Sequence, residues 1–157
     1  MVRNFLDFAQ PLKFQQTEVS VQEVIRSALA SLSLDNFQGI EIDDSQVNGT
    51  IQYVMDKNLI QQAVENLVLN ALESSQPGQK VEISSFLENE RLCIEVRDYG
   101  VGFDDKTRRQ LFNYFFSTKK SGTGLGLPIV QRIVEQHRGS ICVESAPDKG
   151  AVFRIKI

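Results

Sequence analysis

The sequence predicts an α+β fold, a two-layer sandwich in which a mixed β-sheet is covered on one face by about three helices. Helical patterns recur along the chain between short runs of β-forming residues. Two of these runs are joined by the short turn Glu88–Glu90, as in a hairpin, which favours a sheet over separate strands. At 157 residues the chain has room for one well-packed domain, which we expect at residues 14–157.

The first half of the chain contains two helical patterns. Apolar residues at i, i+3, i+4 and i+7 predict a short helix over Val2–Gln10, which Pro11 ends. A second pattern, from Val21 to about Ser33, places its apolar residues on one side, as in a helix that covers a core. Extended segments are expected at residues 17–20, 40–42 and 50–55.

The second half of the chain contains two more helical patterns around an irregular region. One helix is expected from about Asp56 to Ser75, before the helix-ending sequence Gln76-Pro-Gly. Another is expected from about Leu127 to His137, where a glycine closes it. Between them, residues 99–126 are punctuated by glycine and break the regular pattern. Strands are expected at residues 81–87, 91–97, 140–145 and 151–157.

The composition argues against several classes of protein. The formal charge is −3, from 17 basic and 20 acidic residues mixed along the sequence, so no basic stripe suits a nucleic acid. No apolar run approaches the roughly 18 to 20 residues of a membrane span, and we expect no membrane contact by this segment. Cys93 and Cys142 lie in alternating apolar runs and are interpreted as reduced core thiols. This favours a cytoplasmic protein, although a longer protein could carry a membrane anchor elsewhere.

The helix expected at residues 56–75 carries a stripe of amides. At about 100° per residue, Gln62, Asn66, Asn70 and Glu73 share one polar arc opposite a broad apolar one. Asn is a mediocre helix former, so two in one mid-helix stripe have a cost that a binding site would explain. Amide oxygens suit Mg²⁺, which keeps waters and phosphate oxygens among its ligands. The alternative is an amphipathic helix whose solvent side happens to carry amides.

A carboxylate and two glycines follow the strand expected at residues 91–97. In Asp98-Tyr-Gly100-Val-Gly102, the carboxylate can accept a hydrogen bond from an exocyclic amino group. The glycines allow the backbone to approach a flat ring closely. The alternative is an ordinary acidic-glycine turn.

A glycine-rich run precedes the helix expected at residues 127–137. In Lys119-Lys-Ser-Gly-Thr-Gly-Leu-Gly-Leu-Pro128, backbone N–H groups near a helix N-terminus would form a cradle for phosphate, and Lys119 would add positive charge. The alternative is a flexible linker. Phe112, Phe115 and Phe116 precede this run and fit either a core or a mobile flap. The single histidine, His137, is interpreted as a structural residue at a helix end.

The order of these motifs resembles the histidine kinase family. Asn-xxx-Asn on a helix, Asp-x-Gly-x-Gly, a phenylalanine-rich segment and Gly-x-Gly-x-Gly are similar to its N, G1, F and G2 boxes. The family belongs to the ATPase superfamily shared with gyrase B, Hsp90 and MutL, whose fold is of the Bergerat type. The resemblance covers about residues 17–157. The run from Phe115 to Lys119, so close to Gly122, also resembles the short-lid nitrogen-regulator subgroup.

The resemblance implies a role for each matching position. Asn70 would bind Mg²⁺ and Asn66 would support the phosphates of ATP. Asp98 would bind the adenine amino group, and Gly100 and Gly102 would line the base. Asn66, Asn70 and Lys119 would be the catalytic residues. Around the phosphates we expect Lys119, Gly122, Thr123, Gly124, Leu125 and Gly126.

Two departures from the family and superfamily patterns stand out. Tyr99 occupies a position where the family often has Asn, which affects a minor contact. The superfamily hydrolases resemble one another in a glutamate four residues before the Mg²⁺-binding asparagine, where it activates water. Here that position is Asn66, which cannot act as a general base, and Glu65 points about 100° away. Phosphoryl transfer is therefore favoured over hydrolysis.

The resemblance also implies partners. The family's phospho-accepting histidine lies in an upstream helical hairpin, and the pattern at residues 1–13 resembles the tail of that dimerisation domain. We expect a homodimeric full-length protein, a monomeric isolated domain and a cognate response regulator. His137 does not match the acceptor motif. A serine kinase of the anti-sigma type and a nucleotide-binding module without transfer activity are the alternatives.

Overall fold

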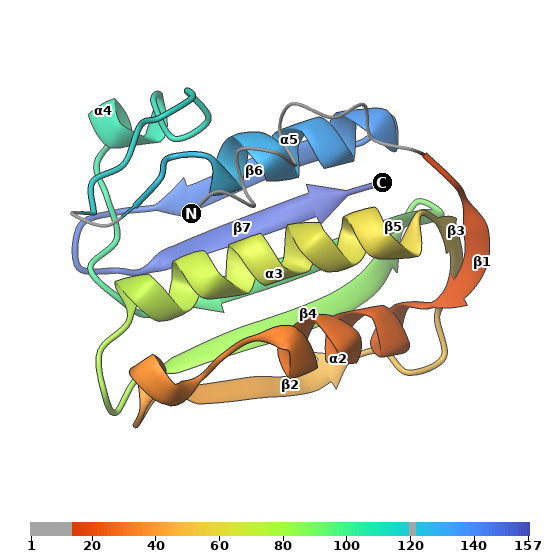
Figure 1. Ribbon diagram of the computed structural model, residues 1–157, viewed down its shortest axis with the longest axis horizontal. Coiled ribbons are helices and arrows are strands. Elements are labelled where there is room, and N and C mark those ends of the chain that lie inside the picture. The colour runs from red at the N-terminus through yellow and green to blue at the C-terminus, as the bar shows by residue number, and fades with distance from the viewer. Residues whose placement is uncertain (1–13, 120–121) are drawn as a thin grey trace.

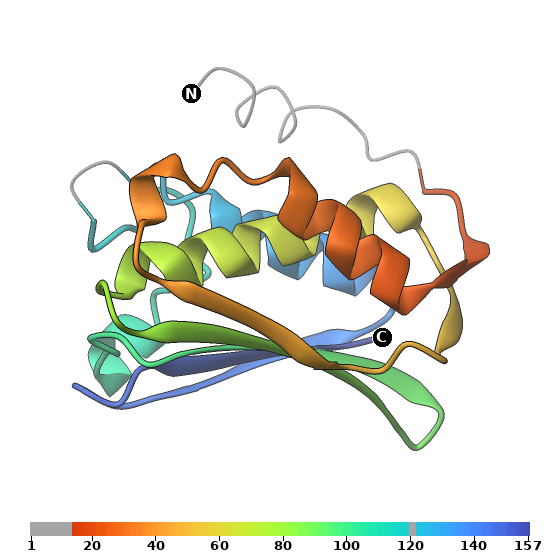
Figure 2. The same ribbon diagram turned by 90° about the horizontal axis from the view of Figure 1, so that it is seen from below.

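The computed structural model describes residues 14–119 and 122–157, and these residues adopt the α+β sandwich that the sequence predicts. Seen edge-on, the main sheet forms one layer and the long helices form the other (Figure 2). The helix expected at Val2–Gln10 lies outside the described residues. Among the residues described, no helix is long and apolar enough to cross a membrane.

The main sheet is mixed and has five strands. Its order is β2-β4-β5-β7-β6, in which β2 is parallel to β4 and the other neighbouring pairs are antiparallel. The strands are β2 (Glu41–Val47), β4 (Lys80–Glu88), β5 (Arg91–Asp98), β6 (Ser140–Ser145) and β7 (Ala151–Lys156). A separate two-stranded sheet pairs β1 (Thr17–Ser20) with β3 (Gln52–Met55).

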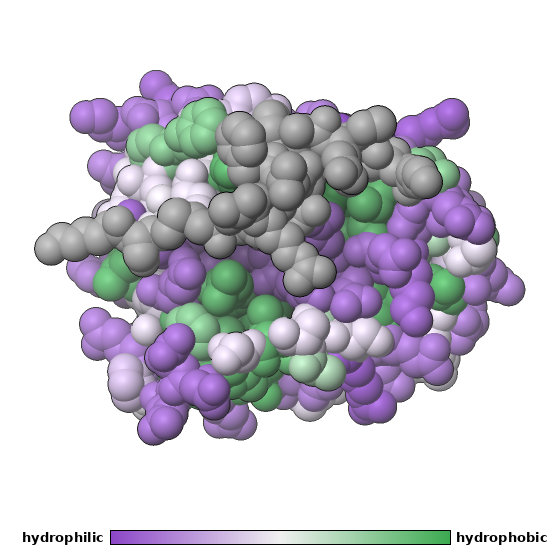
Figure 3. All heavy atoms as spheres, in the orientation of Figure 1, coloured by the Kyte–Doolittle hydropathy of each residue, from purple (hydrophilic) through white to green (hydrophobic). Residues whose placement is uncertain are grey.

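Three helices cover one face of the main sheet. Helix α3 (Lys57–Ser74) packs between α2 (Val21–Ser31) and α5 (Gly126–Gln136), as Figure 1 shows. The apolar side chains of α3 recur with helical spacing and are buried against the sheet, for example Ile60 and Leu67. On this side of the molecule most of the visible surface is hydrophilic, with smaller hydrophobic patches between the purple side chains (Figure 3).

Several elements differ from the expected pattern. Strand β2 extends to Val47 through the polar residues Asp43 and Asp44, because it pairs with β4 along most of its length. A 3-10 turn η1 (Asp35–Phe37) and a one-turn helix α4 (Asp105–Arg108) lie in segments without a periodic apolar pattern.

One of the two cysteines is not a core residue. Cys93 is buried, and burial raises the pKa of its thiol, but Cys142 is exposed. Strand β6 is the edge strand of the sheet, and its residues Ile141 and Val143 face the core, so the residue between them faces solvent. The prediction of two core thiols was therefore wrong for Cys142.

The start of α3 is held by a polar cluster, which we call the closed cluster: the buried Asp56 and His137, and the exposed Gln15, which joins them through its main chain. Asp56 is the N-cap of α3, and its Oδ1 accepts the N–H groups of residues 58 and 59, both at 3.1 Å. Its Oδ2 accepts the Gln15 N–H at 2.7 Å, and its own N–H donates to His137 Nε2 at 3.0 Å. His137 Nδ1 then carries the proton and donates to the Ile133 carbonyl at 2.8 Å. The closed cluster thus joins α3 to α5 and to the segment before β1.

Candidate functional site

Two adjoining cavities lie at the other end of α3. One, of about 200 Å³, lies between α3 and the start of α5, and we call it the α5-side cavity. The other, of about 630 Å³, lies between the end of α3 and the ends of β5 and β7, and we call it the β5-side cavity. Both are lined by Asn70, Glu73, Leu111, Thr118 and Lys119. The two cavities therefore form one cleft with these five residues in the middle.

Asp98 lies at the wall of the β5-side cavity. It is the last residue of β5, and only 2% of its surface is exposed. Burial raises the pKa of its carboxyl, while the Gly100 and Ala151 N–H groups that bond to it act in the opposite direction. Its Oδ1 accepts the Gly100 N–H at 3.0 Å, and this bond orients the carboxyl at the start of the loop that follows β5.

The glycines after Asp98 have different roles. Gly102 lines the β5-side cavity, but Gly100 lines neither cavity. A Cβ atom at residue 100 would lie 1.9 Å from the Ser74 carbonyl oxygen, so only glycine lets the loop pass the end of α3. The Val101 N–H donates to the same carbonyl at 3.4 Å. Gly100 therefore positions the loop, and Gly102 contributes to the cavity wall.

Asn66 and Asn70 project from α3 into the α5-side cavity, and Asn70 reaches the second cavity as well. The Asn66 Nδ2 group donates to the Gln62 carbonyl one turn back at 2.9 Å. This bond orients the amide and leaves its oxygen as an acceptor. Both residues thus lie where the amide stripe predicted them, on the open side of the helix.

The run before α5 contributes to the same cavity. Gly122, Thr123, Gly124 and Gly126 line it, whereas the side chain of Leu125 belongs to the hydrophobic core. Gly124 has φ +66°, and a Cβ atom there would lie 2.3 Å from the Phe115 carbonyl carbon, so residue 124 requires glycine. The Gly124 carbonyl accepts the Phe115 N–H at 3.0 Å, which ties the phenylalanine-rich segment to the glycine run.

The phenylalanine-rich segment is not part of the core. Phe115 is 68% exposed, and neither Phe112 nor Phe116 is fully buried. Phe116 lines the α5-side cavity beside Leu111. None of the three phenylalanines belongs to the core or to the apolar residues packed against it, so the core interpretation is wrong for them, and the mobile flap stays a prediction.

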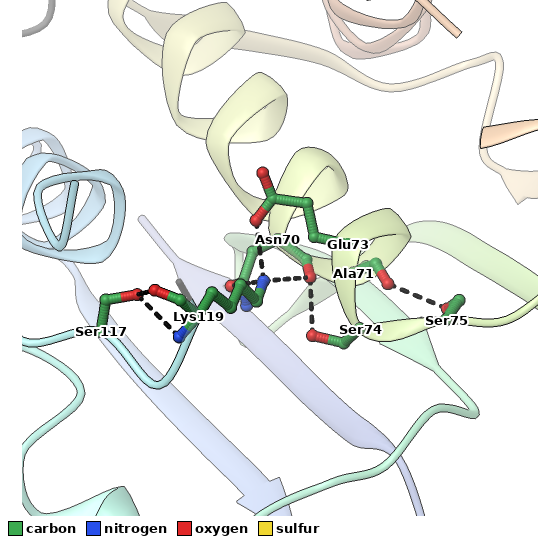
Figure 4. Close-up of polar contacts among 7 residues, drawn as sticks. All are labelled: Asn70, Ala71, Glu73, Ser74, Ser75, Ser117 and Lys119. Carbon is green, nitrogen blue, oxygen red and sulfur yellow. Dashed lines mark hydrogen bonds and ion pairs between the residues drawn. The ribbon is translucent and has the colours of Figure 1, made fainter. Parts of the chain in front are cut away.

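A second polar cluster, the open cluster, lies between the two cavities and consists of Asn70, Glu73 and Lys119. The Lys119 ammonium donates to Asn70 Oδ1 at 3.0 Å, to the Asn70 carbonyl at 3.1 Å and to Glu73 Oε2 at 2.9 Å (Figure 4). Glu73 belongs to the amide stripe but was not among the predicted site residues. Its place in the arc with Asn66 and Asn70 was the signal that could have identified it.

Mg²⁺ can be tested against these residues. Asn70 lines the cleft, and its Oδ1 atom already accepts a hydrogen bond from the positively charged Lys119 ammonium. Mg²⁺ takes oxygen ligands and needs few from the protein when phosphate oxygens and water complete its shell. The site therefore suits a Mg²⁺ ion that arrives with a phosphate ligand.

Two neighbouring residues point away from the cleft. The Glu65 carboxylate accepts the Ser31 hydroxyl of α2 at 2.6 Å and the Gln61 amide at 3.0 Å, so it does not face Asn66 and Asn70. Tyr99 lines neither cavity, and its hydroxyl donates to Glu82 of β4. The interpretation that Glu65 points elsewhere agrees with this geometry.

The chain is similar to known proteins along most of its length. A family model described as histidine kinase-, DNA gyrase B- and HSP90-like ATPase matches residues 55–157. The signal transduction histidine-protein kinase AtoS of Escherichia coli (strain K12) is 29% identical over 157 residues, 99% of this chain and 26% of AtoS. Among curated relatives, the sensor histidine kinase ZraS of Klebsiella oxytoca is 34% identical over 98% of this chain and 34% of ZraS. The chain thus spans about a quarter to a third of these relatives.

Solved structures are similar as well. The catalytic domain of histidine kinase ThkA has a TM-score of 0.77 at 29% identity, covering 91% of this chain and 95% of that domain. ThkA has also been solved in complex with the response regulator protein TrrA. Full-length ShkA in complex with AMPPNP has a TM-score of 0.82 at 25% identity, covering 99% of this chain and 34% of ShkA.

Proposed function

The chain belongs to the family of histidine kinase-, DNA gyrase B- and HSP90-like ATPases, and we propose that it is the ATP-binding catalytic domain of a two-component sensor kinase. In this proposal it transfers the γ-phosphoryl group of ATP to a histidine in a dimerisation domain elsewhere in a longer protein. The observation that carries the proposal is a single cleft lined by Asp98, Asn70 and Lys119, which brings together a buried carboxylate, an amide and a cation.

The β5-side cavity would bind adenine. A carboxylate has about four acceptor positions, so Asp98 can bond to the Gly100 N–H and still accept the adenine amino group. Guanine has a carbonyl at the corresponding place and cannot donate there, so ATP should be preferred over GTP. Phe153 and Ala151 add apolar surface to this cavity, against which a flat ring can pack.

The α5-side cavity would hold the triphosphate. Asn70 would hold Mg²⁺ and Asn66 would support the phosphates. The backbone of residues 122–126 would contribute N–H groups at the start of α5, where the helix dipole favours negative charge. The metal ion supplies charge stabilisation on the phosphate oxygens when bound. Lys119 would supply a second positive charge on the same side of the cleft.

Two observations favour transfer over hydrolysis in this proposal. Asn66 stands where the superfamily hydrolases carry a glutamate, and the nearby Glu65 carboxylate is bonded to α2. The chain's single histidine is 9% exposed, and both of its ring nitrogens are engaged in hydrogen bonds. His137 thus lacks a free nucleophilic nitrogen, and the acceptor would be a histidine of another domain.

The partners follow from this arrangement. A catalytic domain that positions ATP but offers no nucleophile needs an acceptor domain at close range. We therefore include in the proposal a dimerisation domain that carries the accepting histidine, a response regulator that receives the phosphoryl group next, and a homodimeric, cytoplasmic kinase core. The catalytic domain by itself would be monomeric.

One experiment tests the proposal directly. The chain is mixed with [γ-³²P]ATP, Mg²⁺ and a separate fragment of the same protein that contains the accepting histidine. We expect slow labelling of the fragment, because the reaction has become bimolecular, and no labelling of the chain itself. The label should be lost in acid and survive in base, as phosphohistidine does. Labelling of His137, or acid-stable labelling of a hydroxyl in the fragment, would contradict the proposal and favour a serine kinase in the second case.

A further inference from the structure

The open cluster divides the cleft that ATP would occupy. Asn70, Glu73 and Lys119 line both cavities, and the bonds between them cross from α3 to the segment before α5. A nucleotide with its base near Asp98 and its phosphates near residues 122–126 would pass this point. The Lys119 ammonium must therefore exchange its present partners when a nucleotide enters.

The ammonium is fully bonded in the structure. Its three donors have three acceptors, all on the last two turns of α3: two oxygens of Asn70 and one of Glu73 (Figure 4). Of these acceptors only the Glu73 carboxylate is charged, so it contributes most of the attraction. The side chains are 27% exposed for Lys119 and 39% exposed for Glu73, which makes this a weak, exchangeable ion pair.

The main chain of Lys119 is held separately from its ammonium. Ser117 Oγ accepts the Lys119 N–H at 3.1 Å and donates to the Lys119 carbonyl at 3.2 Å. These two bonds form a local turn that does not involve α3. The long side chain can consequently change partners by rotation about its own bonds while the turn persists.

We propose that Glu73 is a positioning residue that holds the Lys119 ammonium on Asn70 in the nucleotide-free chain and releases it to the triphosphate of the bound nucleotide. The inference rests on the proposed ATP site. In the free chain the ammonium covers Asn70 Oδ1, the atom that would bind the metal. With nucleotide bound, Asn70 Oδ1 would be free to hold Mg²⁺, the Lys119 ammonium would donate to the triphosphate, and the Glu73 carboxylate would be left to solvent. Glu73 thus acts on the reaction through Lys119.

Chemical reactivity of Lys119 tests this exchange. The Lys119 ammonium must leave its acceptors and lose a proton before the neutral amine can attack an acetylating reagent, so reactivity reports how firmly the ammonium is held. The rate of acetylation of Lys119 is measured by mass spectrometry, with the exposed Lys106 as an internal reference. In the free chain, Glu73→Gln should raise the Lys119 rate by roughly twofold to fivefold, the range for an exposed ion pair. With saturating AMP-PNP and Mg²⁺, the variant and the original chain should have the same rate.

A matched control is available on the same helix. Glu65→Gln removes one negative charge from α3 at a carboxylate bonded to α2, and it should leave the Lys119 rate unchanged. Equal Lys119 rates in the original chain and Glu73→Gln without nucleotide would overturn the proposal. A rate difference that persists with nucleotide bound would overturn it as well, because Lys119 would then have stayed on Glu73. If calorimetry detects no AMP-PNP binding at all, the ATP site itself fails, while the comparison in the free chain still tests the Glu73 contact.

Discussion

The two ends of α3 carry polar clusters that differ in burial and in the number of elements they join. Asp56 and His137 of the closed cluster are buried, and their hydrogen bonds run to defined main-chain or ring atoms. The open cluster is partly exposed, and all of its contacts between α3 and the segment before α5 are made by the flexible side chain of Lys119. A buried polar network is costly to break, whereas an exposed pair can exchange partners at little cost.

This difference shows how one helix can be both a scaffold and part of a changing site. The closed cluster fixes the start of α3 against α5, and the apolar face of α3 packs against the sheet along the whole helix. Asn66 and Asn70 are therefore held on a rigid element, as the proposed phosphate and metal site would require. In the proposed exchange of partners, only Lys119 and the segment that carries it would change.

The largest expected effect concerns the open end of α3. Asn70→Asp changes the charge at the proposed metal-binding position, removes an amide donor and gives Lys119 a second carboxylate to pair with. We expect phosphoryl transfer to the histidine-containing fragment to fall by roughly 100-fold or more, as when one electrostatic contact to a reacting group is lost. Circular dichroism and urea unfolding should show the fold retained. Transfer at the original rate in Mg²⁺ would place the metal site elsewhere.

Asp98 and Asp56 are both buried carboxylates, and a substitution at Asp98 tests whether it binds nucleotide or only stabilises the fold. It is as buried as Asp56, yet we assign it to base binding. A hydrogen bond to a charged group contributes about 1.5–3 kcal/mol, so Asp98→Ala should weaken ATP binding by roughly 10-fold to 150-fold. Isothermal calorimetry measures this, with GTP as the comparison nucleotide. Unchanged ATP affinity would remove Asp98 from the site.

Asp56 should show the opposite behaviour. Asp56→Ala removes the N-cap of α3 and the acceptor for Gln15, and should lower the free energy of unfolding by about 2 kcal/mol. Glu73→Ala breaks only the partly exposed ion pair with Lys119 and should change the free energy of unfolding by less than about 0.5 kcal/mol. Urea denaturation of both variants makes the comparison. Equal losses of stability would contradict the distinction between the two clusters.

A smaller effect is expected from the raised pKa of Asp98. Because the folded-state pKa lies above the ordinary value of 3.8, the folded chain binds this proton more tightly than the unfolded chain does. The resulting stability is present below the ordinary pKa and is lost as pH rises through the raised one. Relative to Asp98→Asn, the original chain should therefore lose stability as pH rises from 3.8, as unfolding in urea at several pH values would show. A difference independent of pH would mean that the carboxyl is not perturbed by burial.

The motifs with local signals were predictable from the sequence, and the contacts between distant residues were not. Asn66 and Asn70 follow from helical spacing, and Gly124 follows from its place before a helix, because each signal lies within a few residues. The partner of Lys119 is Glu73, 46 residues away, and only the packing of the cleft brings them together.

The same reasoning explains the remaining differences in the fold. The polar stretch of β2 becomes a strand because β4 lies beside it, and Cys142 is exposed because β6 is an edge strand. Neither the pairing of β2 with β4 nor the edge position of β6 can be read from the local sequence. Leu125 was grouped with the phosphate-binding residues through its motif, but its side chain packs in the core, since a motif position does not say which way a side chain points.

Amide hydrogen exchange with and without AMP-PNP and Mg²⁺ tests the contrast between the two ends of α3 most directly. We predict that nucleotide slows exchange over residues 103–119, where few apolar anchors hold the free segment, and leaves unchanged the amides of Leu59 and His137, which are bonded within or beside the closed cluster. Equal exchange over residues 103–119 in the two conditions, or a change centred on Leu59 and His137, would contradict the account.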